Sequence, residues 1–193
     1  MVETGLHGIS LDPPLESLYR HWLSKKRGRA MPCRADIDPL EMPAEIWPYT
    51  MLLDVVWSDD RPRFRYRRVG DIFWRGPGGE PTGRFVDEVL PERAGYRSYV
   101  VGIYEEMARR RRPMYTENSF ALRGRATPMV TRRISLPLSN DGEAINMVLA
   151  GHVFDHGRLA RDVAFSLVTE LKELRRVVLE SCLQRGESEL SEH

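Results

Sequence analysis

The sequence predicts an α+β domain built around an antiparallel sheet. Three segments carry apolar residues at helical spacing, five others are rich in β-branched and aromatic residues, and the strand-like segments come in two blocks. Strands in blocks favour an α+β fold, whereas strict alternation of strands and helices would favour a parallel sheet. The chain has 193 residues, of which 41% are hydrophobic, so one domain can bury a substantial core.

The N-terminal part is predicted to contain one helix and one strand pair. Residues 1–14 show no periodicity and are expected to form a loose arm. The prolines at the end of this arm mark the start of the helix that follows. Residues 47–57 and 63–70 gather strand-forming side chains on either side of a turn, which is typical of a β-hairpin. The helix has one apolar face, formed by Leu15, Leu18, Tyr19, Trp22 and Leu23.

A helical middle and a block of three strands are predicted next. Apolar residues repeat at helical spacing over residues 96–112, and Pro113 prevents that helix from continuing. Together with the two strands of the first hairpin, these three strands give a sheet of five strands. Hairpin turns join neighbouring strands, so the sheet is expected to be antiparallel. The three strands are predicted at residues 114–122, 129–138 and 143–154, within a domain that covers residues 15–155.

A long C-terminal helix is predicted over residues 156–185, followed by a disordered tail at residues 186–193. The apolar positions of this helix alternate spacings of three and four, which gives a stripe that a second copy of the chain can cover. We therefore expect a homodimer. The predicted dimerisation residues are Leu167, Leu171, Leu174 and Val178.

Composition argues against several classes of protein. No apolar run reaches the ~20 residues of a membrane-spanning helix, and the first residues do not form a secretory signal. The two cysteines, Cys33 and Cys182, are far apart, which argues against a disulfide framework and favours the cytoplasm. No metal site is expected, because His152 and His156 are the only histidines close together and no third ligand accompanies them.

Arginine is concentrated in the middle of the chain. Residues 61–133 contain 17 arginines, no lysine and 8 acidic residues, a net charge of +9, although the whole chain carries only +1. Such a segment can bind nucleic acid, or it can pair with acidic flanks of the same protein. Because neither a recognition helix nor a set of exposed stacking aromatics is present, internal pairing is preferred and a nucleic-acid-binding regulator remains an alternative.

Several short motifs point to a known family. They are Leu18-Tyr19 with Trp22, PCRADIDP at residues 32–39, FRYR at 64–67 before Val69-Gly70, TGR at 82–84, and LPLSNDG at 136–142. Together with the layout of a strand pair, a helical middle and a three-strand meander, they resemble PAS domains. The resemblance is to an alphaproteobacterial PAS-like subfamily of unknown role. It implies that a five-stranded antiparallel sheet and the helical middle enclose a cavity.

A ligand pocket in this cavity is the main functional expectation that the resemblance implies. Apolar walls with a few polar groups suit a small molecule, although the same side chains can simply fill the core. Arg68 has the same strand parity as Phe64 and Tyr66, and an inward guanidinium there would require an anion. The candidate lining residues are Arg68, Phe73, Trp74, Phe85, Tyr99, Ile103, Met147 and Leu149.

The expected function is that of a stand-alone sensory or regulatory module. Since the sequence leaves no room for a catalytic output domain, the signal would pass to an unidentified partner protein or through the homodimer. No nucleophile or acid–base motif is recognisable, so an enzyme acting in the same cavity is only an alternative. The helical middle contains neither a histidine for haem nor a cysteine for a flavin adduct, so neither cofactor is expected.

Overall fold

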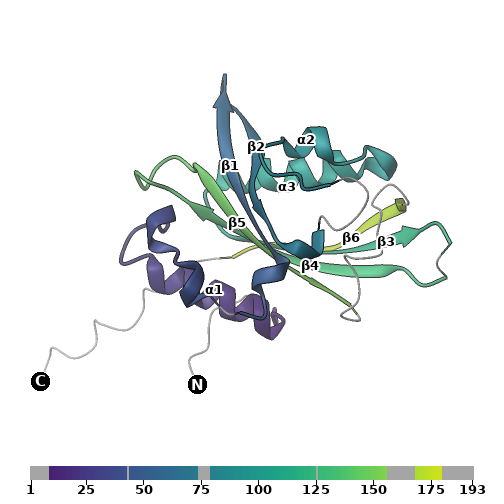
Figure 1. Ribbon diagram of the computed structural model, residues 1–193, viewed down its shortest axis with the longest axis horizontal. Coiled ribbons are helices and arrows are strands. Elements are labelled where there is room, and N and C mark those ends of the chain that lie inside the picture. The colour runs from purple at the N-terminus through teal and green to yellow at the C-terminus, as the bar shows by residue number, and fades with distance from the viewer. Residues whose placement is uncertain (1–8, 43, 74–78, 125, 156–167, 180–193) are drawn as a thin grey trace, which may run out of the picture.

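The protein is built on one six-stranded antiparallel sheet with helices on both faces (Figure 1). The computed structural model describes residues 9–42, 44–73, 79–124, 126–155 and 168–179. The strand order is β2-β1-β5-β4-β3-β6. The strands are β1 (Thr50–Ser58), β2 (Arg61–Val69), β3 (Met114–Leu122), β4 (Met129–Leu138), β5 (Met147–Phe154) and β6 (Val168–Val178). The predicted α+β class is confirmed, but the sheet has six strands instead of five.

The two strongest predicted helices are confirmed. Helix α1 (Pro13–Lys25) begins directly after Asp12, with proline in its first turn, as the sequence predicts. Helix α3 (Tyr96–Arg110) ends where Arg111 adopts a left-handed conformation, two residues before Pro113. The single turn α2 (Val86–Val89) and short 3-10 turns complete the described helices.

Helix α1 covers one face of the sheet, called here the outer face. The indole Nε1 of Trp22 donates a hydrogen bond of 2.8 Å to the carbonyl of Pro137 on β4. The helix also lies close against Gly151 on β5, since a Cβ there would come within 2.5 Å of Leu18 Cδ2 and 3.3 Å of Leu15 Cδ2. A small residue at position 151 therefore sets how closely α1 approaches the sheet.

Helix α3 covers the opposite face, called here the inner face; Figure 1 shows α2 and α3 on one side of the sheet and α1 on the other. The rings of Tyr104 on α3 and Phe64 on β2 lie 5.3 Å apart. Tyr96, at the start of α3, packs edge-to-face on Phe120 of β3 at 5.5 Å. The core therefore has two layers, one on each side of the sheet.

The predicted C-terminal helix is wrong over residues 168–178. These residues form β6, which pairs antiparallel with β3 from Met114↔Val178 to Leu122↔Val168. The leucine spacing favours a helix locally, but strand β3 otherwise has a free edge, and pairing there satisfies its backbone groups. Such a gain depends on partners 46 residues (Leu122 and Val168) to 64 residues (Met114 and Val178) away, so local periodicity does not reveal it.

The predicted dimerisation residues consequently do not form a helical stripe. Leu171 lies opposite Phe120 of β3, and Val178 lies opposite Met114. Leu174 is 45% exposed and is the extra residue at an irregularity of the β3–β6 pairing. Leu167 lies outside the described residues, as do the ends of the predicted helix and the predicted tail at 186–193.

Part of the predicted N-terminal arm is ordered against the domain. Ile9 and Leu11 are buried, and α1 already begins at Pro13. The remainder of the predicted arm, residues 1–8, lies outside the described residues.

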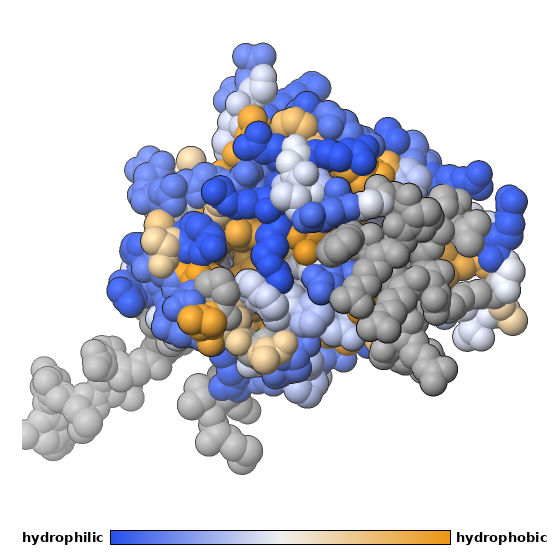
Figure 2. All heavy atoms as spheres, viewed as in Figure 1, coloured by the Kyte–Doolittle hydropathy of each residue, from blue (hydrophilic) through white to orange (hydrophobic). Residues whose placement is uncertain are grey.

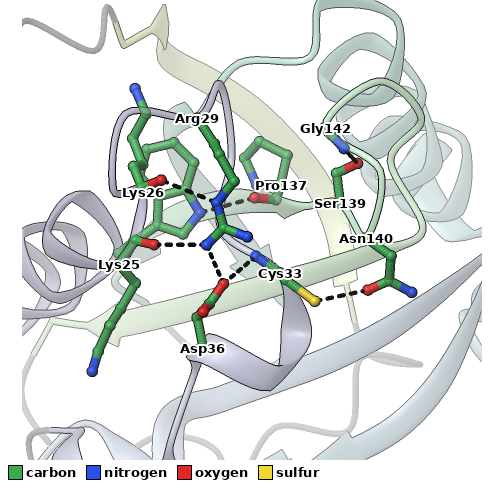
Figure 3. Close-up of polar contacts among 10 residues, drawn as sticks. Lys25, Lys26, Arg29, Cys33, Asp36, Pro137, Ser139, Asn140 and Gly142 are labelled. Atoms are coloured by element: carbon green, nitrogen blue, oxygen red, sulfur yellow. Dashed lines mark hydrogen bonds and ion pairs between the residues drawn. The ribbon is translucent and has the colours of Figure 1, made fainter.

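The PCRADIDP and LPLSNDG motifs, far apart in the sequence, meet in space (Figure 3). Cys33 Sγ lies 3.1 Å from Asn140 Oδ1, and the backbone N–H of Ser139 donates to the Pro32 carbonyl at 2.9 Å. A carboxylate oxygen of Asp36 accepts a 2.8 Å hydrogen bond from the Cys33 backbone N–H and also pairs with Arg29. These motifs therefore fasten the segment after α1 to the turn between β4 and β5.

Most apolar side chains lie inside the protein. On the face drawn in Figure 2, hydrophobic residues reach the surface as separate small patches among hydrophilic ones. Within the described residues, none of the helices combines the length and the apolar character needed to cross a bilayer.

Candidate functional site

Buried polar side chains gather on the inner face, where β3, β4 and β5 run side by side. Paired residues of antiparallel strands point to the same face, so Thr116, Arg133 and His152 form one row across the three strands. Asn118 and Thr131 form the next row, and Ser135 follows Arg133 on the other side. The six residues, called here the inner polar set, are Thr116, Asn118, Thr131, Arg133, Ser135 and His152, and all are buried.

Arg133 and His152 are the centre of the inner polar set. Arg133 is 4% exposed and His152 is 2% exposed, and Arg133 Nε donates to His152 Nε2 at 2.6 Å. A guanidinium can only donate, so Nε2 of His152 accepts and the ring is neutral, with its proton on Nδ1. Burial and the charge of Arg133 hold the pKa of His152 well below its ordinary value, which keeps the ring neutral.

Arg133 has no carboxylate partner among the residues that the structure describes. Its guanidinium carbon lies 5.7 Å from the ring centre of Tyr104. Tyr66, Tyr96 and Tyr99 also lie within range of its charge. Burial raises the pKa of all these phenols, that of Tyr96 to about 12, so they are neutral near pH 7 and supply no counter-charge. A buried cation without an anion is costly in free energy.

Several polar atoms of the inner polar set lack a hydrogen-bond partner within residues 9–42, 44–73, 79–124, 126–155 and 168–179. Burying a polar group without a partner costs about 1–3 kcal/mol, so such atoms are rare in folded proteins. The backbone of Tyr49 acts on the His152 ring and raises its pKa, against the stronger effects of burial and of Arg133. Even so, Nδ1 of His152 forms no hydrogen bond with a described residue. The unpartnered atoms are Arg133 Nη1, His152 Nδ1, Thr116 Oγ1, Thr131 Oγ1, Ser135 Oγ, and both side-chain polar atoms of Asn118.

Aromatic rings border the inner polar set. Phe73, after β2, makes an edge contact with the His152 ring at 4.9 Å, and Phe154 lies 5.9 Å from Phe73. Tyr104 lies on the α3 side. The site therefore combines one cation, several hydrogen-bonding groups and apolar walls, which is the composition of a small-molecule site.

The structure brings only some of the predicted pocket residues to this site. Phe73 contacts His152, and Tyr99 on α3 lies within range of the Arg133 charge. Ile103 is fully buried in the same helix. Phe85 lies at the β2 edge, where the guanidinium of Arg63 stacks 3.8 Å above its ring, and Trp74 lies outside the described residues.

Met147 and Leu149 lie on the outer face instead. Both share the strand parity of Gly151, whose Cβ direction leads to α1. They therefore belong to the layer under α1. The residues of β5 that point to the inner face are His152 and every second residue counted from it. Sequence parity alone could not decide this, because both faces of β5 are buried.

Arg68 also lies on the outer face. Leu52 pairs with Arg68 and Leu53 pairs with Tyr66, so Arg67 is an extra residue that reverses the parity of the strand. The guanidinium of Arg68 stacks 3.5 Å from the ring centre of Trp47 and donates to Thr50 Oγ1 at 3.1 Å. The bulge thus separates Arg68 from the inner side chains of Phe64 and Tyr66.

Sequence analysis missed the two central residues of the site. Arg132 and Arg133 are consecutive in a strand, and consecutive strand residues point to opposite faces, so one of them had to point inward. That pattern could have identified an inward arginine. The sequence raises His152 only as a metal ligand that lacks a third partner, and no sequence signal joins it to Arg133.

Many arginines of the basic segment pair within the protein. Arg63 pairs with Asp87 at 2.9 Å, and Arg67 pairs with Asp54 at 2.9 Å. Further pairs join Arg65 to Asp54, Arg97 to Glu92, Arg110 to Glu106, and Arg132 to Asp155. This pairing lowers the charge that the segment can offer to nucleic acid.

Comparisons with known proteins give no match for this chain. Neither a model of a protein family, nor a curated protein, nor a solved structure matches it. In the part of the chain that the structure describes, no three His, Cys, Asp or Glu side chains are grouped so as to hold a metal ion.

Proposed function

We propose that this chain is a sensory or regulatory module of the PAS type that binds a small molecule on the inner face of its sheet. The strand pair β1–β2 and the meander β3–β5 belong to one sheet, and α3 covers its inner face. This agrees with the layout on which the resemblance rests. The strand β6 is an addition to that layout.

The observation that carries the proposal is the inner polar set. A core that only had to be filled would hold apolar side chains, since unpartnered buried polar groups lower stability. Here six polar residues occupy neighbouring inward positions on three strands, and each has a side-chain atom without a partner in the part of the chain that the structure describes. A ligand with matching groups would satisfy them.

The same site supports a regulatory output. A ligand held against β4 and β5 also contacts the side of α3 that carries Tyr104, so occupancy changes how α3 packs on the sheet. The signal would then pass to an unidentified partner protein or to a second copy of the chain. The proposal includes a homodimer in the cytoplasm, although its interface cannot be the predicted helical stripe within residues 168–178.

Native mass spectrometry of the purified full chain tests this proposal. We expect a non-covalently bound small molecule, and the same spectrum reports whether the chain is a dimer. The variant Thr131→Val/Ser135→Ala removes two inward hydroxyls while preserving shape, and it should retain less of the molecule. Ser119→Ala, on the other face of β3, is the matched control and should behave like the wild type.

A different result would contradict the proposal. If the wild type carries no small molecule, and no compound in a metabolite library raises its melting temperature, the inner polar set is not a ligand site. Equal retention by the wild type and Thr131→Val/Ser135→Ala would place the bound molecule elsewhere.

A further inference from the structure

We infer that the ligand is a small organic acid with a single carboxylate, which binds the guanidinium of Arg133. This inference rests on the proposed function, because it names the class of ligand for the same site. It depends on the charge, the hydrogen-bonding groups and the walls of the site.

The charge of the site favours an anion. Arg133 is buried, and no described carboxylate pairs with it. Its neighbour His152 is neutral, and the surrounding phenols are neutral as well. The described residues of the site therefore carry a net charge of +1, which an anion of one charge balances.

The free hydrogen-bonding groups favour an acceptor. Arg133 Nε is occupied by His152, whereas Nη1 has no hydrogen-bond partner among the described residues. The hydroxyls of Thr116, Thr131 and Ser135 lie on the same face and can all donate. The two oxygens of a carboxylate can accept from Nη1 and from a neighbouring hydroxyl.

A carboxylate fits this site better than a phosphate. A phosphate monoester carries about −1.5 to −2 charges at pH 7 and would leave excess negative charge in a buried site with one cation. Phe73 and Phe154 line one border of the site. An acid with an apolar body can pack against these rings, whereas an inorganic anion cannot.

Benzoate and benzamide are the probes that test this inference. They have nearly the same shape, but only benzoate carries a negative charge. Calorimetric titration of the full chain should show benzoate binding at least about tenfold more tightly than benzamide, because a hydrogen bond to a charged group is lost in the amide. Acetate and inorganic phosphate, titrated in the same way, should bind more weakly than benzoate.

The variant Arg133→Met keeps most of the side-chain volume and removes the charge. It should weaken benzoate binding at least about tenfold and weaken benzamide binding less, because the guanidinium donates more strongly to a carboxylate than to a neutral amide oxygen. Arg132→Met is the matched control, since Arg132 lies on the outer face among carboxylates. It should bind benzoate like the wild type. Far-ultraviolet circular dichroism verifies that both variants are folded.

The outcomes separate this inference from the proposed function. If benzamide binds as tightly as benzoate, or if Arg133→Met binds benzoate like the wild type, the carboxylate inference is overturned while a neutral ligand remains compatible with the module. Tighter binding of phosphate than of benzoate also overturns it. If none of the acids binds to the folded wild type, the inference fails, and native mass spectrometry then decides whether the proposed function fails as well.

Discussion

Arg132 and Arg133 are consecutive residues of β4 that meet opposite surroundings. Arg132 points to the outer face and pairs with Asp155 at 2.6 Å, Glu117 at 3.3 Å and Asp12 at 3.6 Å. Arg133 points to the inner face, where its described neighbours include a neutral histidine and no paired carboxylate. The alternation of a strand thus places one arginine in an ion-pair network and the other in a buried site.

The two arginines should respond differently to replacement by methionine. Arg133→Met removes a buried charge that no described carboxylate balances, so the free energy of unfolding should stay constant or rise by about 1–4 kcal/mol. Arg132→Met leaves three carboxylates close together, and the free energy of unfolding should fall by about 1 kcal/mol. Urea denaturation measures both. A loss of stability in Arg133→Met larger than in Arg132→Met would show that Arg133 is satisfied within the protein.

The neutral state of His152 predicts a stability loss in mild acid. An unfolded histidine titrates near ~6.5, whereas burial and the Arg133 charge lower the pKa of His152 in the folded protein. Below about pH 6.5 the unfolded chain therefore binds more protons, and the free energy of unfolding falls by up to about 1.4 kcal/mol per pH unit. The free energy of unfolding stops falling once the pH is below the pKa of His152 in the folded protein.

His152→Gln isolates this effect, because the glutamine oxygen can still accept from Arg133 Nε. Urea denaturation between pH 5 and 8 should give a flatter profile for the variant than for the wild type. His21, whose pKa burial also lowers, is present in both proteins, so its contribution cancels. Parallel pH profiles would mean that His152 titrates in the folded protein as it does in the unfolded chain.

Two glycines should differ in their tolerance of alanine. A Cβ at Gly70 would lie 2.0 Å from the backbone oxygen of Pro48, which cannot move without shifting the chain. A Cβ at Gly151 would instead meet the Leu18 side chain, which can rotate at a cost of about 1–3 kcal/mol. Thermal denaturation should therefore show a larger loss for Gly70→Ala than for Gly151→Ala. The reverse order would contradict the described approach of Gly70 to Pro48.

Proline substitutions distinguish the strand β6 from a helix. The backbone N–H of Leu179 donates to the Pro113 carbonyl at 2.8 Å. By the alternation of antiparallel pairs, the N–H of Val177 also points to β3 and that of Val178 points away. Val177→Pro should therefore lower the free energy of unfolding by about 1 kcal/mol more than Val178→Pro, as measured by urea denaturation. In a helix, both substitutions would remove an internal hydrogen bond and their effects would be alike.

The sequence by itself determined the elements with strong local signals. The apolar face of α1, the periodicity of α3 before Pro113, and the strands β3 and β4 follow from spacing and breakers within each segment. The antiparallel sheet and the α+β class follow from their order. The helices and the hairpins depend on interactions among residues near one another in the chain.

The tertiary structure alone decided the remaining features. Residues 168–178 form a strand because the edge of β3 offers them backbone partners, which outweighs their helical spacing. An extra residue at Arg67 places Arg68 on the outer face, and helix packing places Met147 and Leu149 there as well. Arg133 and His152 meet only because β4 and β5 pair in one register. Strand register depends on side chains distant in the sequence, and one residue of slip exchanges the two faces.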